Sequence, residues 1–283
     1  MQKYQLQMKI KLILVFFSFF TGLYSQNSLV CLTYNIKLDF PKDGENSWTN
    51  RQPLILSQLQ FYEPDIFGVQ EAMPNQMKDL DSLLSDYDFV GVGRDDGNDK
   101  GEYSAIFYKS NQFKIISTST FWLSQTPEKV SMGWDAVCHR VCTYALFENR
   151  ITKKQFYVFN THFDHVGVEA RKNSAVLIIQ KIREINTEME PVILMGDFNM
   201  EENHESIHYI SQYLNDSKSV SSSKPFGPTG TFNGFNFNQP VTERIDFIFV
   251  SPEIQVNKYA VLSDSEACRY PSDHLPVLVI LNL

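Results

Sequence analysis

Short apolar, β-rich runs recur along this chain, and a polar residue closes several of them. Ile66–Gln70 is followed by Glu71, and Val192–Met195 is followed by Gly196 and Asp197. Runs of this length, bounded by turn residues and alternating with segments of helical spacing, are typical of buried strands. The pattern therefore predicts core strands that carry polar side chains at their ends.

Runs of strand type outnumber those of helical type, and many follow one another without an intervening helix. The predicted strands are Val30–Tyr34, Ile66–Gln70, Phe89–Val92, Ser104–Tyr108, Phe113–Ile116, Cys138–Phe147, Phe156–Asn160, Val192–Met195, Ile245–Val250 and Val277–Leu281. The predicted helices are Trp48–Phe61, Met77–Leu84, Glu169–Ile185 and 205–214. This order favours an α/β fold with two mixed sheets packed face to face and helices outside. A single doubly wound sheet is the alternative.

The first 25 residues differ from the rest of the chain. A start with three lysines precedes the apolar run Leu12–Phe20, and small residues follow as far as Ser25. The run is too short to span a hydrocarbon core of about 30 Å, so a secretory signal peptide is favoured over an uncleaved membrane anchor. We therefore expect export to the periplasm or the medium, with residues 26–283 forming a single domain without a membrane span.

The charge of the mature chain bears on its partners. Loss of residues 1–25 removes three lysines and no acid, which moves the formal net charge from −8 to −11. Affinity for nucleic acid rests on many Lys and Arg contacts to phosphates. An acidic chain is therefore a poor general binder of nucleic acid, although a local basic patch can offset its charge.

The chain has four cysteines. Cys138 and Cys142 lie in one predicted strand, where they would be about 13 Å apart, which is beyond the reach of a disulfide. The spacing matches no common zinc site. We predict buried free thiols for most of the four and leave the pairing of Cys31 and Cys268 open.

Several polar residues stand at or just beyond the ends of predicted strands: Asn35, Glu71, His162, Asp197, Asn199, Asp246, Asp273 and His274. Taken singly, each has an ordinary explanation, because Asp and Asn are common in turns. Asp246 is harder to explain, since it interrupts an apolar strand and a buried carboxylate is costly unless it is paired. His274 is the partner that we expect for it.

The order of these residues resembles the endonuclease/exonuclease/phosphatase superfamily, which includes pancreatic DNase and the poly(A)-removing nucleases. Its most specific pieces are Gly-Asp-Phe-Asn at 196–199, Ser-Asp-His at 272–274 and Asn-Thr-His at 160–162. The stretch from Gly133 to Arg140 is similar to a bacterial subgroup near the poly(A)-removing branch. The resemblance covers roughly Leu29 to Leu283. It implies a four-layer α/β/β/α sandwich with the site at one edge of two packed sheets.

The resemblance also implies a metal ion and a directed water molecule. Glu71 would bind Mg²⁺, or alternatively Mn²⁺, with Asn35 nearby and Asp273 assisting. Asp197 would orient or deprotonate the attacking water, and Asn199 would hold that water or a phosphate oxygen. An oxygen-ligated cation suits this chemistry because it neutralises the anionic ester before attack.

Two histidines would contact the phosphate. Asp246 would fix the tautomer of His274, and Glu102 would pair with His162. Further candidates for substrate binding are Asp135, Arg140, Asp164 and His165. For Arg140, a surface salt bridge is the competing interpretation.

These features predict an exported, divalent-metal-dependent phosphoesterase in which an activated water attacks in line. The acidic charge favours a small, sugar or lipid phosphoester. The alternative is a secreted nuclease for DNA or RNA, which would need a basic groove built from residues such as Lys37, Arg51, Arg140, Arg171 and Lys172. A non-catalytic binding protein is the third hypothesis. We expect a monomer.

Overall fold

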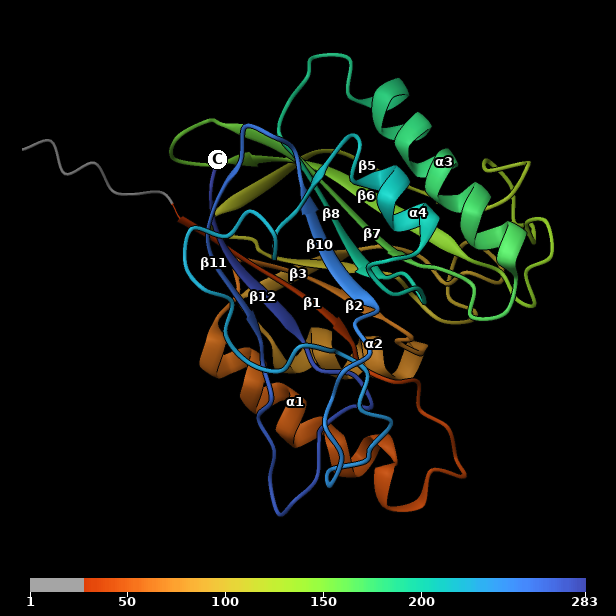
Figure 1. Cartoon of the computed structure of the whole chain (residues 1–283), viewed down its shortest axis with the longest axis vertical. Helices are drawn as coiled ribbons and strands as arrows, with labels where there is room; N and C mark the ends of the chain where they lie inside the picture. Colours follow the sequence, from red (N-terminus) through yellow and green to blue (C-terminus); the bar gives the residue numbers. More distant parts are fainter. Residues whose placement is uncertain (1–27) are drawn as a thin grey trace, which may run out of the picture.

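The computed structural model describes residues 28–283, and the predicted signal peptide lies outside this range. Two six-stranded sheets pack face to face, with helices on both outer sides (Figure 1). The first sheet has the order β11 (Gln255–Val261), β12 (Val277–Asn282), β1 (Ser28–Asn35), β2 (Ile66–Gln70), β4 (Ile106–Lys109) and β3 (Tyr87–Val90). The second has the order β5 (Phe113–Trp122), β6 (Val141–Asn149), β7 (Gln155–His162), β8 (Val192–Asp197), β10 (Asp246–Val250) and β9 (Asn215–Asp216).

The helices complete the predicted four layers. The first sheet is covered by α1 (Trp48–Tyr62) and α2 (Pro74–Leu83), and the second by α3 (Val168–Ile185) and α4 (Glu205–Ile210) (Figure 1). A short 3-10 turn at Gly44–Asn46 precedes α1. The α/β/β/α sandwich is therefore confirmed, and the single doubly wound sheet is wrong. Among the described residues, no helix is both long and apolar enough to cross a membrane.

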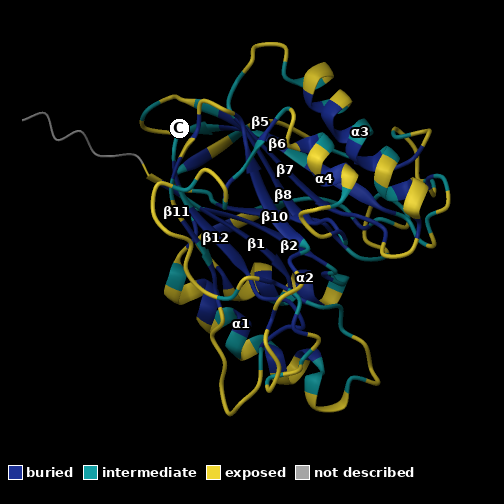
Figure 2. Cartoon of the chain, in the orientation of Figure 1, coloured by how far each residue is buried: buried dark blue, intermediate teal, exposed yellow. Residues whose placement is uncertain are grey.

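The core has three parts, one between the sheets and one under each pair of helices. Figure 2 shows the strands of both sheets as buried and the outer faces of the helices as exposed. Ile193 of β8 and Phe159 of β7 are fully buried. Each such side chain contributes about 1.5–3 kcal/mol of transfer free energy. This packing fixes the two sheets against each other and with them the strand ends that carry the polar residues.

Strand register brings those ends together. β1 and β2 run parallel, with Asn35 opposite Gln70. In the other sheet, Asp197 lies opposite His162 of the parallel β7 and opposite Asp246 of the antiparallel β10. The register therefore places three predicted site residues of the second sheet on adjacent strands at one edge.

One glycine is required for this register. Gly196 has φ +146°, and a Cβ atom at this position would lie 2.0 Å from the carbonyl oxygen of Thr161 on β7. Only glycine permits this approach of the two backbones. Gly196 therefore lets β8 deliver Asp197 beside the end of β7.

The structure differs from the sequence prediction at several boundaries. β11 was not predicted, because it is an edge strand with a bulge between Val256 and Lys258 and alternating exposed residues instead of an apolar run. β6 begins at Val141, so Cys138 lies in the preceding loop instead of on a strand with Cys142. α4 ends at Ile210, earlier than the predicted 214. All four cysteines are free, but only Cys31 and Cys142 are fully buried.

Candidate active site

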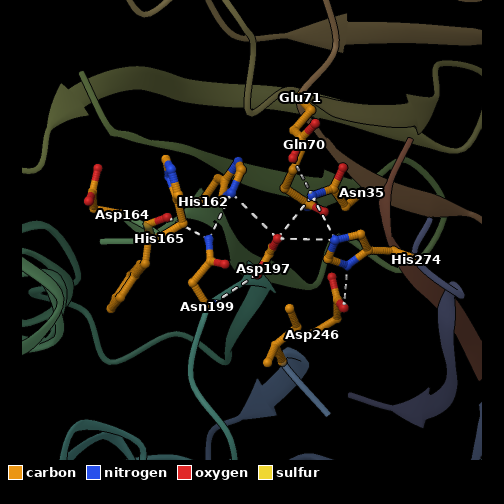
Figure 3. Close-up of polar contacts among 12 residues, drawn as sticks. Asn35, Gln70, Glu71, His162, Asp164, His165, Asp197, Asn199, Asp246 and His274 are labelled. Carbon is orange, nitrogen blue, oxygen red and sulfur yellow. Dashed lines mark hydrogen bonds and ion pairs between the residues drawn. The ribbon is translucent and has the colours of Figure 1, made fainter. Parts of the chain in front are cut away.

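The downstream ends of the central strands meet at one edge of the sandwich, where their polar side chains converge (Figure 3). Asn35 ends β1, and Glu71 directly follows β2. His162 ends β7 and Asp197 ends β8, whereas Asp246 begins β10, which runs in the opposite direction. Both sheets therefore contribute to one group of side chains, which we call the Asp197 cluster: Asn35, Glu71, His162, Asp197, Asn199, Asp246 and His274.

Asp197 lies at the centre of this cluster and is buried. The amide Nδ2 of Asn35 donates to its Oδ2 at 2.9 Å and also to Oε1 of Glu71 at 3.1 Å. Nε2 of His162 lies 3.4 Å from the same Oδ2 atom, and Nε2 of His274 lies 3.8 Å from it. One carboxylate oxygen therefore lies among an amide and two imidazoles (Figure 3).

His274 is held from behind by Asp246. Its Nδ1 lies 2.9 Å from Oδ2 of Asp246, which is the contact that the sequence predicted. The ring of Phe232 packs edge-on against the imidazole at 5.1 Å. With Nδ1 engaged, Nε2 is the nitrogen that points toward Asp197, an arrangement familiar from catalytic triads.

Asn199 closes the other side of the cluster. Its φ of +51° is left-handed, a conformation that Asn tolerates better than most residues. Its backbone N–H donates to Oδ1 of Asp197 at 2.9 Å, and its Nδ2 donates to the carbonyl of Phe163 at 2.9 Å. The same Nδ2 lies 3.0 Å from Nε2 of His162. The turn after β8 thus fixes Asp197, Asn199 and His162 relative to one another.

Glu71 and Asp273 form a place for a cation. The ammonium Nζ of Lys37 lies 3.6 Å from Oε2 of Glu71 and 3.8 Å from Oδ2 of Asp273. The backbone N–H of Leu38 also donates to Oε2 of Glu71 at 3.1 Å. Carboxylate oxygens are the ligands that Mg²⁺ prefers, and a lysine already bridges these two. The ligand atoms of Asp197, Asp246 and His274 also lie within 4.8 Å of one another, although here the imidazole of His274 is already held by Asp246. The donor set of the cluster therefore fits a divalent cation.

The two imidazoles differ in their electrostatic surroundings. Burial lowers the pKa of His162, and the guanidinium groups of Arg140 and Arg94 lower it further. Burial acts in the same direction on His274, but the carboxylates of Asp246 and Asp197 outweigh it and raise the pKa of His274. The first ring is therefore neutral near pH 7, and the second carries a positive charge.

The backbone under the cluster is held by residues that the sequence did not single out for this task. Arg51 of α1 is buried, and its Nη1 donates to the carbonyls of Ile36 at 2.6 Å and Pro271 at 3.1 Å. This bond set joins the loop after β1 to the loop that carries His274. The sequence alone assigned Arg51 to a basic groove, because nothing in the helix pattern marks it as buried.

A second buried network joins the two sheets beneath the cluster. Nε2 of Gln70 donates to Oδ1 of Asn160 at 2.6 Å, and Nδ2 of Asn160 donates to backbone carbonyls of the first sheet. A Cβ atom on Gly68 would lie 2.7 Å from the Asn160 side chain. These amides therefore tie β2 to β7 just below Glu71 and His162.

A cleft of about 530 Å³ opens over the cluster. It is lined by Lys37, Leu38, Glu71, Arg94, Glu102, Cys138, Arg140, His162, His165, Asp197, Asn199, Phe232, Glu243, Ile245, Asp273 and His274. Three of these lining residues are not part of the Asp197 cluster and lie on loops beside His162. We call Arg94, Glu102 and Arg140 the arginine wall. The sequence did not identify Arg94, which lies in a polar loop without any motif.

The predicted basic groove is only partly present. Lys37 and Arg140 line the cleft. Arg171 instead donates from Nη1 to the carbonyl of Asp164 at 3.2 Å, and Lys172 pairs with an exposed glutamate of α4 at 3.4 Å. Because Arg51 is buried against backbone carbonyls, three of the five predicted groove residues do not line the cleft.

The predicted pairing of Glu102 with His162 is wrong. Both carboxylate oxygens of Glu102 accept from Arg94, one of them at 2.7 Å from Nη1. Nδ1 of His162 has no hydrogen-bond partner within residues 28–283. A bidentate guanidinium is a stronger partner for a carboxylate than a neutral imidazole. Glu102 therefore belongs to the wall of the cleft.

Asp135 does not lie at the cleft, which corrects its prediction as a substrate-binding residue. Its Oδ1 accepts from the backbone N–H of Ala170 at 2.7 Å, and its Oδ2 from that of Glu169 at 3.3 Å. These are donors of the first turn of α3, which lack partners within the helix. The carboxylate therefore caps α3.

Asp164 is also occupied by protein contacts, which corrects its prediction as a substrate-binding residue. Its Oδ1 accepts from the backbone N–H of Gly167 at 2.7 Å and of Val166 at 3.0 Å, and its Oδ2 lies 3.4 Å from Nε of Arg140. Burial alone would raise its pKa, but these hydrogen bonds lower it to about 2. Asp164 thus positions Arg140, whereas His165 lines the cleft as predicted, with Nδ1 at 2.9 Å from Nη2 of Arg140.

Comparison with known proteins identifies the family. The model of the Endonuclease/Exonuclease/phosphatase family matches residues 32–274. The chain belongs to this family. The family assignment made from the sequence motifs is confirmed, and the chain is a hydrolase of the class that acts on phosphoester bonds.

Solved structures of this family are similar over nearly the whole described chain. A mannosyl-6-phosphatase from Bacteroides thetaiotaomicron is 42% identical, with 89% of this chain and 99% of that chain covered and a TM-score of 0.86. Another family protein from the same organism is 41% identical, with 90% and 97% covered and a TM-score of 0.87. The catalytic domain of human Nocturnin, solved with a bound sulfate anion, is 23% identical, with 90% and 93% covered and a TM-score of 0.72. This last likeness shows the shared fold.

Proposed function

We propose that this family member is an exported, Mg²⁺-dependent phosphoesterase that hydrolyses a small phosphate ester, with sugar phosphates as the preferred class. The central observation is that Asp197 lies among Asn35, His162 and His274 on the floor of a cleft whose rim holds the acidic pair Glu71 and Asp273. This arrangement offers a directed base, hydrogen-bond donors for phosphoryl oxygens and a place for a cation in one cavity.

The residues of the cluster divide the reaction between them. Asp197 orients the water that attacks phosphorus, and Asn199 fixes Asp197 through its backbone N–H and His162 through its Nδ2. His274, fixed by Asp246, donates a hydrogen bond from Nε2 to a phosphoryl oxygen, on which negative charge grows as the water attacks. Pre-positioned donors of this kind lower the barrier because they need no reorganisation during the reaction.

Glu71 and Asp273 would hold Mg²⁺, with Asn35 beside them. When bound, the ion neutralises phosphate charge and so makes the ester accessible to an anionic nucleophile. Lys37 lies between the two carboxylates and keeps them from repelling each other. Lys37 also lines the cleft.

Two observations favour a small ester over a nucleic acid. The mature chain has a formal charge of −11 once the three lysines within residues 1–25 are removed from the total of −8, and three of the five residues of the predicted basic groove do not line the cleft. The similar structure from Bacteroides thetaiotaomicron is described as a mannosyl-6-phosphatase. A secreted nuclease remains the competing hypothesis, because Lys37 and Arg140 do line the cleft.

Export is inferred from residues 1–25, whose charged start and apolar run match a secretory signal peptide. The proposal places the mature protein, beginning at about Gln26, in the periplasm or the medium. The native host would be separated into cells, periplasm and medium, and the mass of the protein in each fraction would show where it lies and whether residues 1–25 have been removed.

A substrate panel separates the two hypotheses. Residues 26–283 would be assayed with Mg²⁺ on mannose 6-phosphate, an aryl phosphate, a bis-aryl phosphate, sphingomyelin, and single- and double-stranded nucleic acid. We expect turnover of the small esters with a weak dependence on salt. Rapid cleavage of nucleic acid that falls steeply with added salt, together with inert small esters, would replace the proposal with the nuclease.

A further inference from the structure

The arginine wall has unused hydrogen-bonding capacity that points into the cleft. Nη1 of Arg140 and Nε of Arg94 are buried, and neither has a hydrogen-bond partner among the described residues. Arg140 itself is only 5% exposed and lines the cleft. A buried donor without a partner is costly, at about 1–3 kcal/mol. Because Arg94 and Arg140 line the cleft, a ligand bound there could partner these donors.

The rest of each guanidinium is fixed by protein contacts. Arg140 is held through Nε by Asp164 at 3.4 Å and through Nη2 by His165 at 2.9 Å. Arg94 is held by Glu102, and its own carbonyl accepts from Nε1 of Trp122 at 2.8 Å. Both arginines are therefore oriented before any ligand arrives, and the free donors keep a defined direction.

Glu102 supplies the acceptors of the same wall. Each of its oxygens accepts from Arg94, and a carboxylate oxygen has two lone-pair sites. The residue lines the cleft, so one further site on each oxygen is open to a ligand. A pair of acceptors flanked by guanidinium donors matches adjacent hydroxyl groups, each of which donates one hydrogen bond and accepts others.

The wall stands on the His162 side of the Asp197 cluster, since Nη2 of Arg140 lies 2.9 Å from His165, in the loop that follows β7 and His162. A phosphoryl group bound by His162 and His274 would therefore direct one of its substituents toward the wall. An apolar leaving group would desolvate the Glu102 carboxylate and leave its remaining acceptor sites unused. A group with several hydroxyls would satisfy it.

We propose that Arg94 and Glu102 form a subsite for a polyhydroxylated, sugar-like leaving group, and that Nη1 of Arg140 binds an oxygen of its phosphoryl group. The inference rests on the proposed function and narrows it to phosphate esters of sugars.

A metal ion held by Cys138, Asp164 and His165 is the competing use of this region, because their ligand atoms lie within 4.8 Å of one another. Arg140 argues against it. Its guanidinium contacts both Asp164 and His165, and a fixed positive charge at that place repels a cation. The charge instead favours the anionic end of a sugar phosphate.

The test compares two substrates in the mature protein. kcat/KM would be measured for mannose 6-phosphate and for an aryl phosphate, which shares the phosphoryl group but has no hydroxyls. We divide kcat/KM for mannose 6-phosphate by kcat/KM for the aryl phosphate. Glu102→Gln is expected to lower this ratio about tenfold, because one acceptor becomes a donor facing Arg94 and the sugar. Glu128→Gln, which alters an exposed glutamate paired with Lys181, is the matched control and should leave the ratio unchanged.

A second variant protects the test against misfolding. Arg94→Lys keeps the charge but loses the bidentate contact that orients Glu102, so it should lower the ratio in the same direction. An unchanged ratio in both variants, with thermal transitions like that of the wild type, would overturn the subsite.

Binding of the sugar phosphate decides the matter independently of turnover. Calorimetry with mannose 6-phosphate should show binding to the wild type that Glu102→Gln weakens about tenfold. If the wild type hydrolyses neither substrate, the proposed function fails. The subsite then stands or falls on this titration alone: binding that Glu102→Gln weakens supports it, and binding that is absent or insensitive to Glu102 refutes it.

Discussion

The Asp197 cluster and the arginine wall line one cleft, but they are built in different ways. The cluster comes from the ends of central strands in both sheets, where register and packing fix each residue. The wall comes from loops: Arg94 and Glu102 lie between β3 and β4, and Arg140 lies between β5 and β6. Side chains of the cluster mainly bond to one another, with Nδ1 of His162 and Oδ1 of Asp246 left without a partner, whereas in the wall two guanidinium donors have no partner in the described structure.

This difference separates chemistry from selection. A loop can change its length or residues without disturbing strand register, so the wall can vary while the cluster is kept. Family membership therefore says much about the reaction and little about the substrate. The comparison can be tested by variants that act on one region and spare the other.

Among the variants that retain Asp197, the largest effect is expected within the cluster, at Asp246. Asp246→Asn keeps the size of the side chain but removes the charge that orients His274, so kcat should fall about 10²-fold. KM should change little. The fall in kcat should be equal for sugar and aryl phosphates, because the sugar or aryl group of the substrate does not touch Asp246. Steady-state kinetics on both substrates measures this.

Asp264→Asn is the control for Asp246→Asn, since Asp264 lies outside the cleft and bonds to Tyr62. Normal kcat in Asp246→Asn would show that the 2.9 Å contact with His274 has no catalytic role. A large loss of thermal stability would show that its role is structural.

A smaller effect is expected at the wall. Arg140→Lys retains the charge, but an ammonium cannot hold Asp164 and His165 while also pointing a donor into the cleft. We expect kcat/KM for phosphate monoesters to fall about tenfold, which corresponds to the loss of one hydrogen bond to a charged group. Arg269→Lys, at an exposed arginine paired with Glu45, is the control. Unchanged kinetics would remove Arg140 from substrate binding.

The smallest effect concerns Asp135, which lies outside both regions. Asp135→Ala removes the capping carboxylate of α3, so the free energy of unfolding should fall by about 1 kcal/mol. Activity should stay near the wild-type value, because the side chain does not line the cleft. Denaturant unfolding and kinetics on the same sample check both statements. A loss of activity without a loss of stability would restore Asp135 as a binding residue.

The sequence predicted the cluster better than the wall, and strand structure is the reason. Asp197 and His162 follow apolar runs whose burial is readable from the sequence, and the ends of such strands meet at one edge. The contact between Asp246 and His274 could be expected because a buried carboxylate needs a partner. The two-sheet fold followed from the same runs, whereas the edge strand β11 was missed because its residues alternate.

The wall depends on loop conformation, which leaves little trace in sequence. Glu102 was assigned to His162 although Arg94 lies closer and binds it more strongly. Asp135 and Asp164 were assigned to substrate binding together with Arg140 and His165, but backbone N–H groups occupy both carboxylates. Which donors a loop carboxylate meets depends on the turn that the chain makes, and periodicity does not encode that turn.

Release of inorganic phosphate from mannose 6-phosphate by residues 26–283 tests the central claim most directly. The assay would be run with Mg²⁺, with a chelator, and with the Asp197→Ala variant. We expect turnover that the chelator abolishes and Mg²⁺ restores, and a loss of about 10²–10⁴-fold in Asp197→Ala without a lower melting temperature. Turnover that is unchanged by the chelator would contradict a metal-dependent reaction. An Asp197→Ala protein that is either fully active or unfolded would contradict a reaction centred on Asp197.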